Sequence, residues 1–503
     1  MSVPSSPAAK DYLSTMIDTE DGDCTEYAAL IGAENQESDP IETCKPYTRS
    51  YNPFYVAVVA SLMFLIADTV GYLTVAPRLV IFEEIICRDY YSRAMGDPRE
   101  MGDCKVEPVQ SELALINGWR EALDNIPAIL VSIPYGILAD RVGRKQVLLL
   151  GMLGCLLSDA WVNLVAWFPE IFPLRAVWYS GLWQLIGGGG ASISSMCFTM
   201  IADICPPEMR TSAFSGVHAA VLVAELIAVP AGAALMSVDV WVPVFGASVL
   251  MLVGIFLASV LVPNLHPALS KQDRGAADER PDGLSPAPRM MAYVRQSVAD
   301  LRQNAGWMRN RSILLVTGSF FVCQLGRQIT GITLQYAAAK FHWTFDRASL
   351  LVSLRAGVNL FVLVAVIPAL SYVLTKRLQY DDAVKDKRLT QINGVCLIVG
   401  SAIIFLAASP PALVFGQAIF ALGVAFSVTA RSFLTGMVDP RHLGAVYTAV
   451  TAMLYGGLVI GSPLLAQALQ LGLQLGGTWV GLPFLLAAVL FTLALGAVSA
   501  AKL

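Results

Sequence analysis

The fold of this chain is decided by the stretch Gly136-Ile-Leu-Ala-Asp140-Arg141-Val-Gly143-Arg144-Lys145, which lies between two long apolar runs. Its two glycines allow the backbone to bend sharply or to approach a neighbour closely, and its aspartate suits the positive end of a helix. Its three basic residues favour the cytoplasmic side of a membrane. The stretch therefore predicts a tight cytoplasmic turn between two membrane helices.

The composition also indicates a membrane protein. Of the 503 residues, 55% are hydrophobic and only 14% are charged, whereas about 25% of the residues in soluble domains are charged. A helix that spans a bilayer needs about 20 apolar residues. Twelve runs meet this requirement, at 53–80, 112–139, 146–168, 175–201, 212–236, 241–262, 312–337, 347–374, 391–408, 412–436, 443–470 and 479–500. We therefore expect an all-α integral membrane protein with 12 transmembrane helices.

The distribution of basic residues predicts the orientation. Most of the 34 Lys and Arg residues fall in segments that lie inside the cell when both termini are cytoplasmic, and cytoplasmic loops carry such an excess. The formal net charge of -4 predicts no nucleic-acid partner, because nucleic-acid binding needs a basic surface.

Four segments are expected along the chain. Residues 1–52 are acidic with few large apolar residues, which predicts a disordered cytoplasmic tail. Two six-helix bundles, 53–262 and 312–503, flank a cytoplasmic linker at 263–311. Apolar residues recur at helical spacing in the linker, with arginines between them, so it holds either an amphipathic helix on the membrane surface or a solvated connection.

The turn at 136–145 has the pattern G-x-x-x-D-R-x-G-R-K, which resembles the signature loop of the major facilitator superfamily of secondary transporters. The resemblance implies two bundles that rock about a site near the middle of the bilayer. It also implies that Asp140 faces the start of the eleventh helix, and that Arg144 pairs with Asp203 in a gate latch. The alternative is that these charged side chains only reach for the membrane surface.

Further segments resemble a fungal branch of the superfamily that is distantly similar to the proton-coupled folate transporters. They are Ile85-Ile-Cys87-Arg-Asp-Tyr-Tyr91, Ile126-Pro127 with Pro134-Tyr135-Gly136, Leu334-Gln335-Tyr336, Ser353-Leu-Arg355-Ala and Ala430-Arg431-Ser432. Members of that branch accompany secondary-metabolite pathways as exporters. The resemblance implies proton-linked efflux of a small organic molecule, a fungal secondary metabolite. Proton-coupled uptake of an organic anion or nutrient, and a nutrient sensor that does not transport, are the alternatives.

Charged residues within the predicted spans are the candidates for coupling and substrate binding, because a charge at a helix centre costs about 2.5–3.5 kcal/mol. Asp68 and Glu225 are the candidates for proton coupling, since a buried carboxyl can exchange protons near neutral pH. Arg327, Arg355 and Arg431 are candidates for holding an anionic substrate group or for serving as counter-ions to the acids. The alternative for each acid is a structural ion pair with a nearby arginine.

Two of the nine cysteines, Cys87 and Cys104, fall together in a predicted outer loop, where oxidising conditions allow a disulfide. The chain has no phosphate-binding loop and no protease or hydrolase motif, so we expect no enzyme, no catalytic residue, no metal and no cofactor. A proton gradient is the expected energy source, and lipid and a small organic substrate are the expected partners.

The expected location is the plasma membrane, with a monomer that crosses it many times. Glu26-Tyr-Ala-Ala-Leu30-Ile31 resembles an acidic dileucine sorting signal, which makes a vacuolar or endosomal membrane the alternative.

Overall fold

The computed structural model describes residues 52–95, 102–205, 207–263, 310–377, 379, 381–438 and 443–502. Every regular element within these ranges is a helix, and the described residues from Asn52 onward belong to one compact unit. The predicted acidic tail and the predicted linker, with its amphipathic helix, lie almost entirely outside the described residues.

The N-terminal half, α3 to α10, precedes the linker. Its elements are α3 (Pro53–Leu73), α4 (Val75–Met95), α5 (Glu107–Val142), α6 (Arg144–Trp167), η1 (Leu174–Tyr179), α7 (Ser180–Trp183), α8 (Gly189–Ile204), α9 (Pro207–Leu235) and α10 (Trp241–Leu261).

The C-terminal half, α13 to α21, follows the linker. Its elements are α13 (Arg311–Arg327), α14 (Ile329–Phe341), α15 (Phe345–Phe361), the π-helical η3 (Val362–Val366), α16 (Ile367–Lys376), α17 (Asp382–Leu406), α18 (Pro410–Leu422), α19 (Phe426–Met437), α20 (Leu443–Leu475), η5 (Gly477–Gly481) and α21 (Leu482–Ala500).

Helix length and hydropathy confirm an all-helical membrane protein. Within the described ranges, 9 helices are long and apolar enough to cross a membrane, and Ala219–Leu235 is a shorter apolar helix. The predicted runs 112–139, 175–201 and 212–236 are also helical over most of their length, in α5, in η1 with α7 and α8, and in α9. The count of twelve spans stays a prediction.

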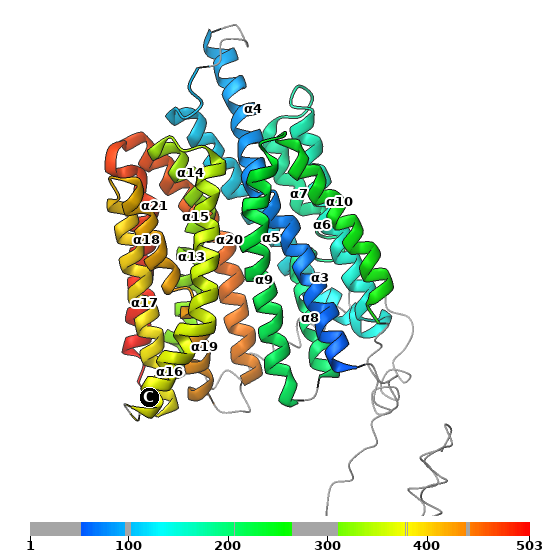
Figure 1. Cartoon of the computed structure of the whole chain (residues 1–503), viewed down its shortest axis with the longest axis vertical. Helices are drawn as coiled ribbons and strands as arrows, with labels where there is room; N and C mark the ends of the chain where they lie inside the picture. Colours follow the sequence, from blue (N-terminus) through cyan, green and yellow to red (C-terminus); the bar gives the residue numbers. More distant parts are fainter. Residues whose placement is uncertain are drawn as a thin grey trace, which may run out of the picture. The chain divides into compact units, whose positions relative to one another are not determined.

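The first helical segment is longer than predicted. The apolar run ends near residue 80, where charged residues begin, but α4 continues to Met95 and extends toward the top of the view in Figure 1. Phe82 and Ile86 stay buried on one face of this helix. The charged side chains therefore occupy the other positions without ending the helix.

The two halves meet along two pairs of helices. α5 packs against α20, and α9 packs against α15, which lie side by side in Figure 1. At Gly118 of α5, an added Cβ would lie only 2.5 Å from Cβ of Ala466 on α20. A residue without a side chain is therefore required for this close approach of the halves.

The buried apolar residues form two clusters that differ in their reach. One cluster joins residues of α4, the start of α5 and the end of α6 to residues of every long helix of the C-terminal half. The other contains only residues of the N-terminal half, in α3, α6, α8, α9 and α10 and at the end of α5. The halves thus share one core at the end of the molecule where α5 begins.

Candidate functional site

A buried ion pair joins the two halves. Arg355 of α15 donates from Nη2 to Oε1 of Glu225 on α9, and the two residues are 7% and 4% exposed. Removing two charges from water costs free energy that only close pairing offsets. Sequence reasoning singled out both residues, and the structure brings them together as partners.

Two more of the predicted residues, Asp68 and Arg327, act on the same tyrosine as this pair. Tyr72 of α3 interacts electrostatically with Glu225, Asp68, Arg355 and Arg327, so these four charged groups lie within electrostatic range of one phenol. Within the described residues, Asp68 makes no ion pair. The structure therefore gathers both predicted acids and two of the three predicted arginines into one polar region, which we call the Tyr72 cluster.

The third predicted arginine, Arg431, does not belong to the Tyr72 cluster. Arg327 donates from Nη1 to Oγ of Ser427 on α19, at 3.3 Å. Arg431 lies one turn further along α19, and its side chain is exposed. The structure does not bring Arg431 to Asp68 or Glu225 as a counter-ion. Its other predicted role, which is to hold an anionic group of the substrate, stays a prediction.

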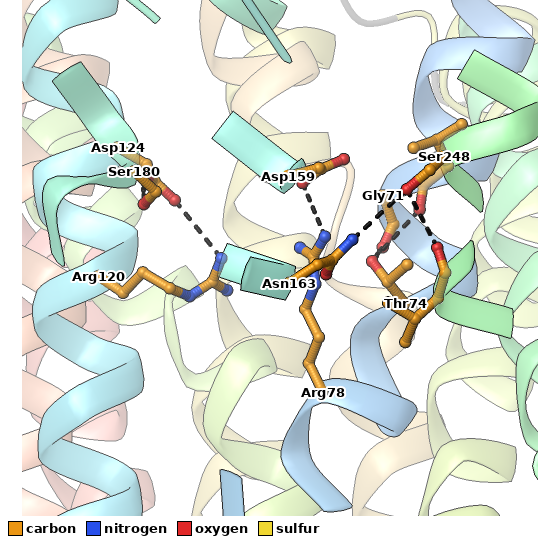
Figure 2. Close-up of polar contacts among 11 residues, drawn as sticks. Gly71, Thr74, Arg78, Arg120, Asp124, Asp159, Asn163, Ser180 and Ser248 are labelled. Atoms are coloured by element: carbon orange, nitrogen blue, oxygen red, sulfur yellow. Dashed lines mark hydrogen bonds and ion pairs between the residues drawn. The ribbon is translucent and has the colours of Figure 1, made fainter. Parts of the chain in front are cut away.

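Another set of charges pairs within the N-terminal half (Figure 2). Arg78 of α4 reaches Asp159 of α6 at 2.7 Å, while Arg120 of α5 reaches Asp124 at 3.5 Å. Asp124 also accepts a hydrogen bond of 2.6 Å from Ser180. The Arg78–Asp159 pair joins α4 to α6, and the Ser180–Asp124 hydrogen bond joins α7 to α5, so these two contacts are suited to holding helices of this half together.

The predicted signature loop forms the junction between α5 and α6. Gly143 has φ 103° between the two helices, a conformation that favours glycine. Nε of Arg144 lies 3.3 Å from Oδ2 of Asp203 on α8, and Lys145 is half-buried in the first turn of α6. The side chains of Asp140 and Arg141 lie outside the description.

Gly136 does not make the close contact that its position in the loop suggests. It lies inside α5, and a Cβ added there would meet nothing within 4 Å. The helix continues through this part of the signature, so the bend occurs at Gly143 instead.

A disulfide holds the segment between α4 and α5. Cys87 and Cys104 are bonded, with their Cα atoms 5.4 Å apart, but Cys87 lies within α4 and not in the predicted loop. The next residue, Lys105, places Nζ 2.6 Å from Oε1 of Glu83 and 4.2 Å from the centre of the Phe345 ring on α15. The disulfide thus fixes a lysine that touches both halves, a contact that sequence reasoning missed.

Loss of this disulfide should destabilise the protein. The bonded cysteines are 17 residues apart, and closing a loop of that size contributes about 3 kcal/mol in the chain-entropy model. We expect Cys87→Ser to lower the melting temperature of the purified protein, whereas Cys396→Ser, which removes a free cysteine, should change it little. Two free thiols at positions 87 and 104 in alkylation mass spectrometry of the non-reduced protein would contradict this account.

A carboxyl that sequence reasoning missed lies on the same helix as Gly118. Glu121 of α5 lines a small cavity with Gln328 and Gln335 of the C-terminal half. The sequence held a signal for this position. Ala114, Gly118 and Glu121 are spaced four and three residues apart, and residues at such spacing share one face of a helix, which puts the carboxyl on the same face as two small residues.

Comparison with known proteins identifies the family. The model of the Major Facilitator Superfamily matches residues 114–462. "Efflux pump ustT" of Aspergillus flavus is 62% identical over 515 aligned residues, which cover 100% of both chains. "MFS efflux pump atnC" of Emericella nidulans is 30% identical, and the alignment covers 82% of this chain and 81% of that protein.

A solved structure supports the same fold. The human organic anion transporter MFSD10 superposes with a TM-score of 0.56 at 16% identity, over 89% of this chain and 100% of that one. Likeness at this identity concerns the fold alone. Together, the family model and the relatives of high identity show that this chain belongs to the major facilitator superfamily of membrane transporters.

Proposed function

We propose that this chain is a secondary active transporter that exports a small organic molecule, a fungal secondary metabolite, in exchange for protons. The observation that carries the proposal is the buried Glu225–Arg355 pair between the two halves, with Asp68, Tyr72 and Arg327 beside it. The identity of 62% to a protein named an efflux pump supports export over uptake. The predicted similarity to folate transporters remains a prediction.

The pair suits a transporter because it can be opened in two ways. Separating Glu225 from Arg355 leaves two buried charges without compensation. A proton on Glu225 removes one of these charges, and an anionic group on the substrate compensates the other. Because the intact pair holds α9 to α15, the proton and the substrate each permit the conformational change that the pair opposes. One ligand carries the chain in each direction, which exchanges substrate for protons.

We also propose that the described conformation is open toward the cytoplasm. The halves share an apolar core at the end where α5 begins, and Lys105 contacts Phe345 there. The second apolar cluster, around α3 and α8, stays within the N-terminal half. Under the predicted orientation, the shared core closes the external side of the molecule.

The protein's other expected properties follow from this assignment. A polytopic membrane protein of this family meets the lipid bilayer on its outer face, and many large apolar side chains of the described helices are exposed, among them Leu130, Ile227 and Phe256. We propose a monomer in the plasma membrane, since export from the cell requires that location. Uptake of an organic anion and a sensor without transport remain the alternatives.

Untargeted mass spectrometry of cells and medium tests the proposal. Strains that lack or overproduce the chain are compared at equal biomass. We expect a compound that accumulates in the cells of the deletion strain and is depleted from its medium, with the reverse on overproduction. Movement in the opposite direction would favour uptake, and unchanged pools with altered gene expression would favour the sensor.

The Arg144–Asp203 contact predicts a gating variant. Asp203 is 41% exposed at its side chain, so the contact should contribute about 1 kcal/mol or less to stability. We expect Arg144→Ala to reduce export several-fold at normal abundance in the membrane, and the exchange Arg144→Asp with Asp203→Arg to restore part of it. Lys145→Ala is the matched control, and equal export by Arg144→Ala and this control would rule out a latch.

A further inference from the structure

A second polar site lies between the halves, lined by residues other than those of the Tyr72 cluster. α5, α14 and α20 enclose a cavity of about 20 Å³, measured as the space open to the centre of a water molecule, and it is lined in part by Asn117, Glu121, Gln328, Gln335 and Ser462. A cavity needs about 10–15 Å³ by this measure to hold one water. The cavity therefore has room for one water among five polar side chains.

Glu121 faces this cavity without a cation of its own. Within the described residues it makes no ion pair, and the charged groups that act on it are Arg120 and Asp124, both on α5. Arg120 is itself paired with Asp124. Ser462 of α20 is a hydrogen-bond partner of the carboxyl. The polar groups that α14 and α20 contribute to the cavity are uncharged, so no positive charge among them neutralises an ionised Glu121.

The carboxyl is pressed against the C-terminal half. A Cβ added at Gly331 of α14 would lie 3.4 Å from Oε2 of Glu121. On the same helix, Gln335 is 3% exposed, and its Oε1 has no hydrogen-bond partner within the described residues. Ser462 of α20 donates to Oε1 of Gln328 at 3.3 Å, so the amide oxygen of Gln328 has a donor and that of Gln335 does not.

The protonation state of Glu121 decides whether the cavity is satisfied. An ionised carboxylate only accepts hydrogen bonds, whereas a protonated carboxyl also donates one. The unpartnered oxygen of Gln335 needs a donor, which a protonated Glu121 supplies either directly or through one water. Ionised Glu121 leaves that acceptor unmatched and places an uncompensated charge between the halves.

We propose that Glu121 is a proton-binding residue that controls separation of α5 from α14 and α20. With the proton bound, the halves stay together at this cavity. With the proton lost, the charge favours separation, which admits water to the carboxylate. The side from which the proton arrives rests on the proposed export cycle. Under the predicted orientation, acid outside the cell protonates Glu121 and favours the externally closed state. Glu121 is distinct from Glu225, which lies on α9 and pairs with Arg355.

Cysteine accessibility tests the proposal without any substrate. Ile332 lines the cavity and is 7% exposed, so Ile332→Cys places a smaller reporter there. Intact cells that carry the full-length chain are treated with a membrane-impermeant maleimide, and chain without the reporter corrects for background. Maleimide reacts with the thiolate, so acid alone slows it. Each rate is therefore divided by the rate of Ile171→Cys, a reporter at a 70% exposed position in the turn after α6. As external pH falls from about 8 to about 5, we expect this relative labelling rate to fall about tenfold, because protonated Glu121 keeps the interface closed.

Two variants separate Glu121 from other groups. Glu121→Gln keeps the shape and cannot ionise, so the labelling rate relative to Ile171→Cys should be low and independent of pH. Glu112→Gln is the matched control, because it removes another carboxyl of α5, one that pairs with Arg175, and it should keep the pH response. An undiminished pH response of the relative rate in Glu121→Gln, or no labelling of Ile332→Cys at any pH with Glu121 intact, would overturn the proposal. If instead labelling behaves as expected and no metabolite is exported, only the proposed function fails.

Discussion

Arg355→Ala should abolish most export and destabilise the protein, because it leaves Glu225 buried without its partner. Glu225 is 4% exposed, and removing one member of a buried pair costs about 3–5 kcal/mol. We expect export to fall at least about tenfold. The measurements are export per molecule of protein in the membrane and the melting temperature of the purified chain.

The double variant Glu225→Leu with Arg355→Met separates stability from coupling. Replacing both members of a buried pair by apolar residues of similar volume is often neutral or stabilising, so the double variant should melt near the wild-type temperature. It should still fail to export, because neither the proton site nor the cation remains. Export restored in the double variant would mean that the pair has only a structural role.

Gly187→Ala should be the most damaging single change in the N-terminal half. Gly187 has φ +86°, and a Cβ added there would lie 2.1 Å from the backbone carbon of Leu150 on α6. Neither the backbone conformation nor the space admits a side chain. We expect a loss of more than about 3 kcal/mol of stability, seen as little folded protein in the membrane and a much lower melting temperature.

Gly190→Ala is the matched control, three residues away. A Cβ added at Gly190 would meet nothing within 4 Å, and alanine stabilises a helix by about 1 kcal/mol relative to glycine. Gly190→Ala should therefore be neutral or slightly stabilising. Equal melting temperatures for the two variants would contradict the close contact between α6 and the segment before α8.

The fold was largely predictable because bilayer thickness fixes the length of a spanning helix. Apolar runs marked the spanning helices, and the pattern around Gly143 marked the turn between α5 and α6. The break between α7 and α8 was not predicted. It depends on Gly187 and its neighbours taking positive φ against α6, which is a contact between helices and leaves no periodic trace in the sequence.

The candidate site was predictable residue by residue but not as an arrangement. Charges within apolar runs pointed to Glu225 and Arg355, which are 130 residues apart. Their pairing depends on how α9 packs against α15, and one sequence does not contain that information. Arg431 lies on the same apolar run as Ser427, yet its side chain is exposed, because position along a helix does not determine which face meets a neighbour.

Transport into inside-out membrane vesicles tests the central claim most directly. Vesicles with and without the chain are supplied with a metabolite extract of the deletion strain and acidified in their lumen, and the compounds that enter are identified by mass spectrometry. Our account predicts one or a few compounds that accumulate only with the chain and only under the pH gradient, and not with Arg355→Ala at equal abundance. No accumulation of any compound, with folded chain present in the vesicles, would contradict it.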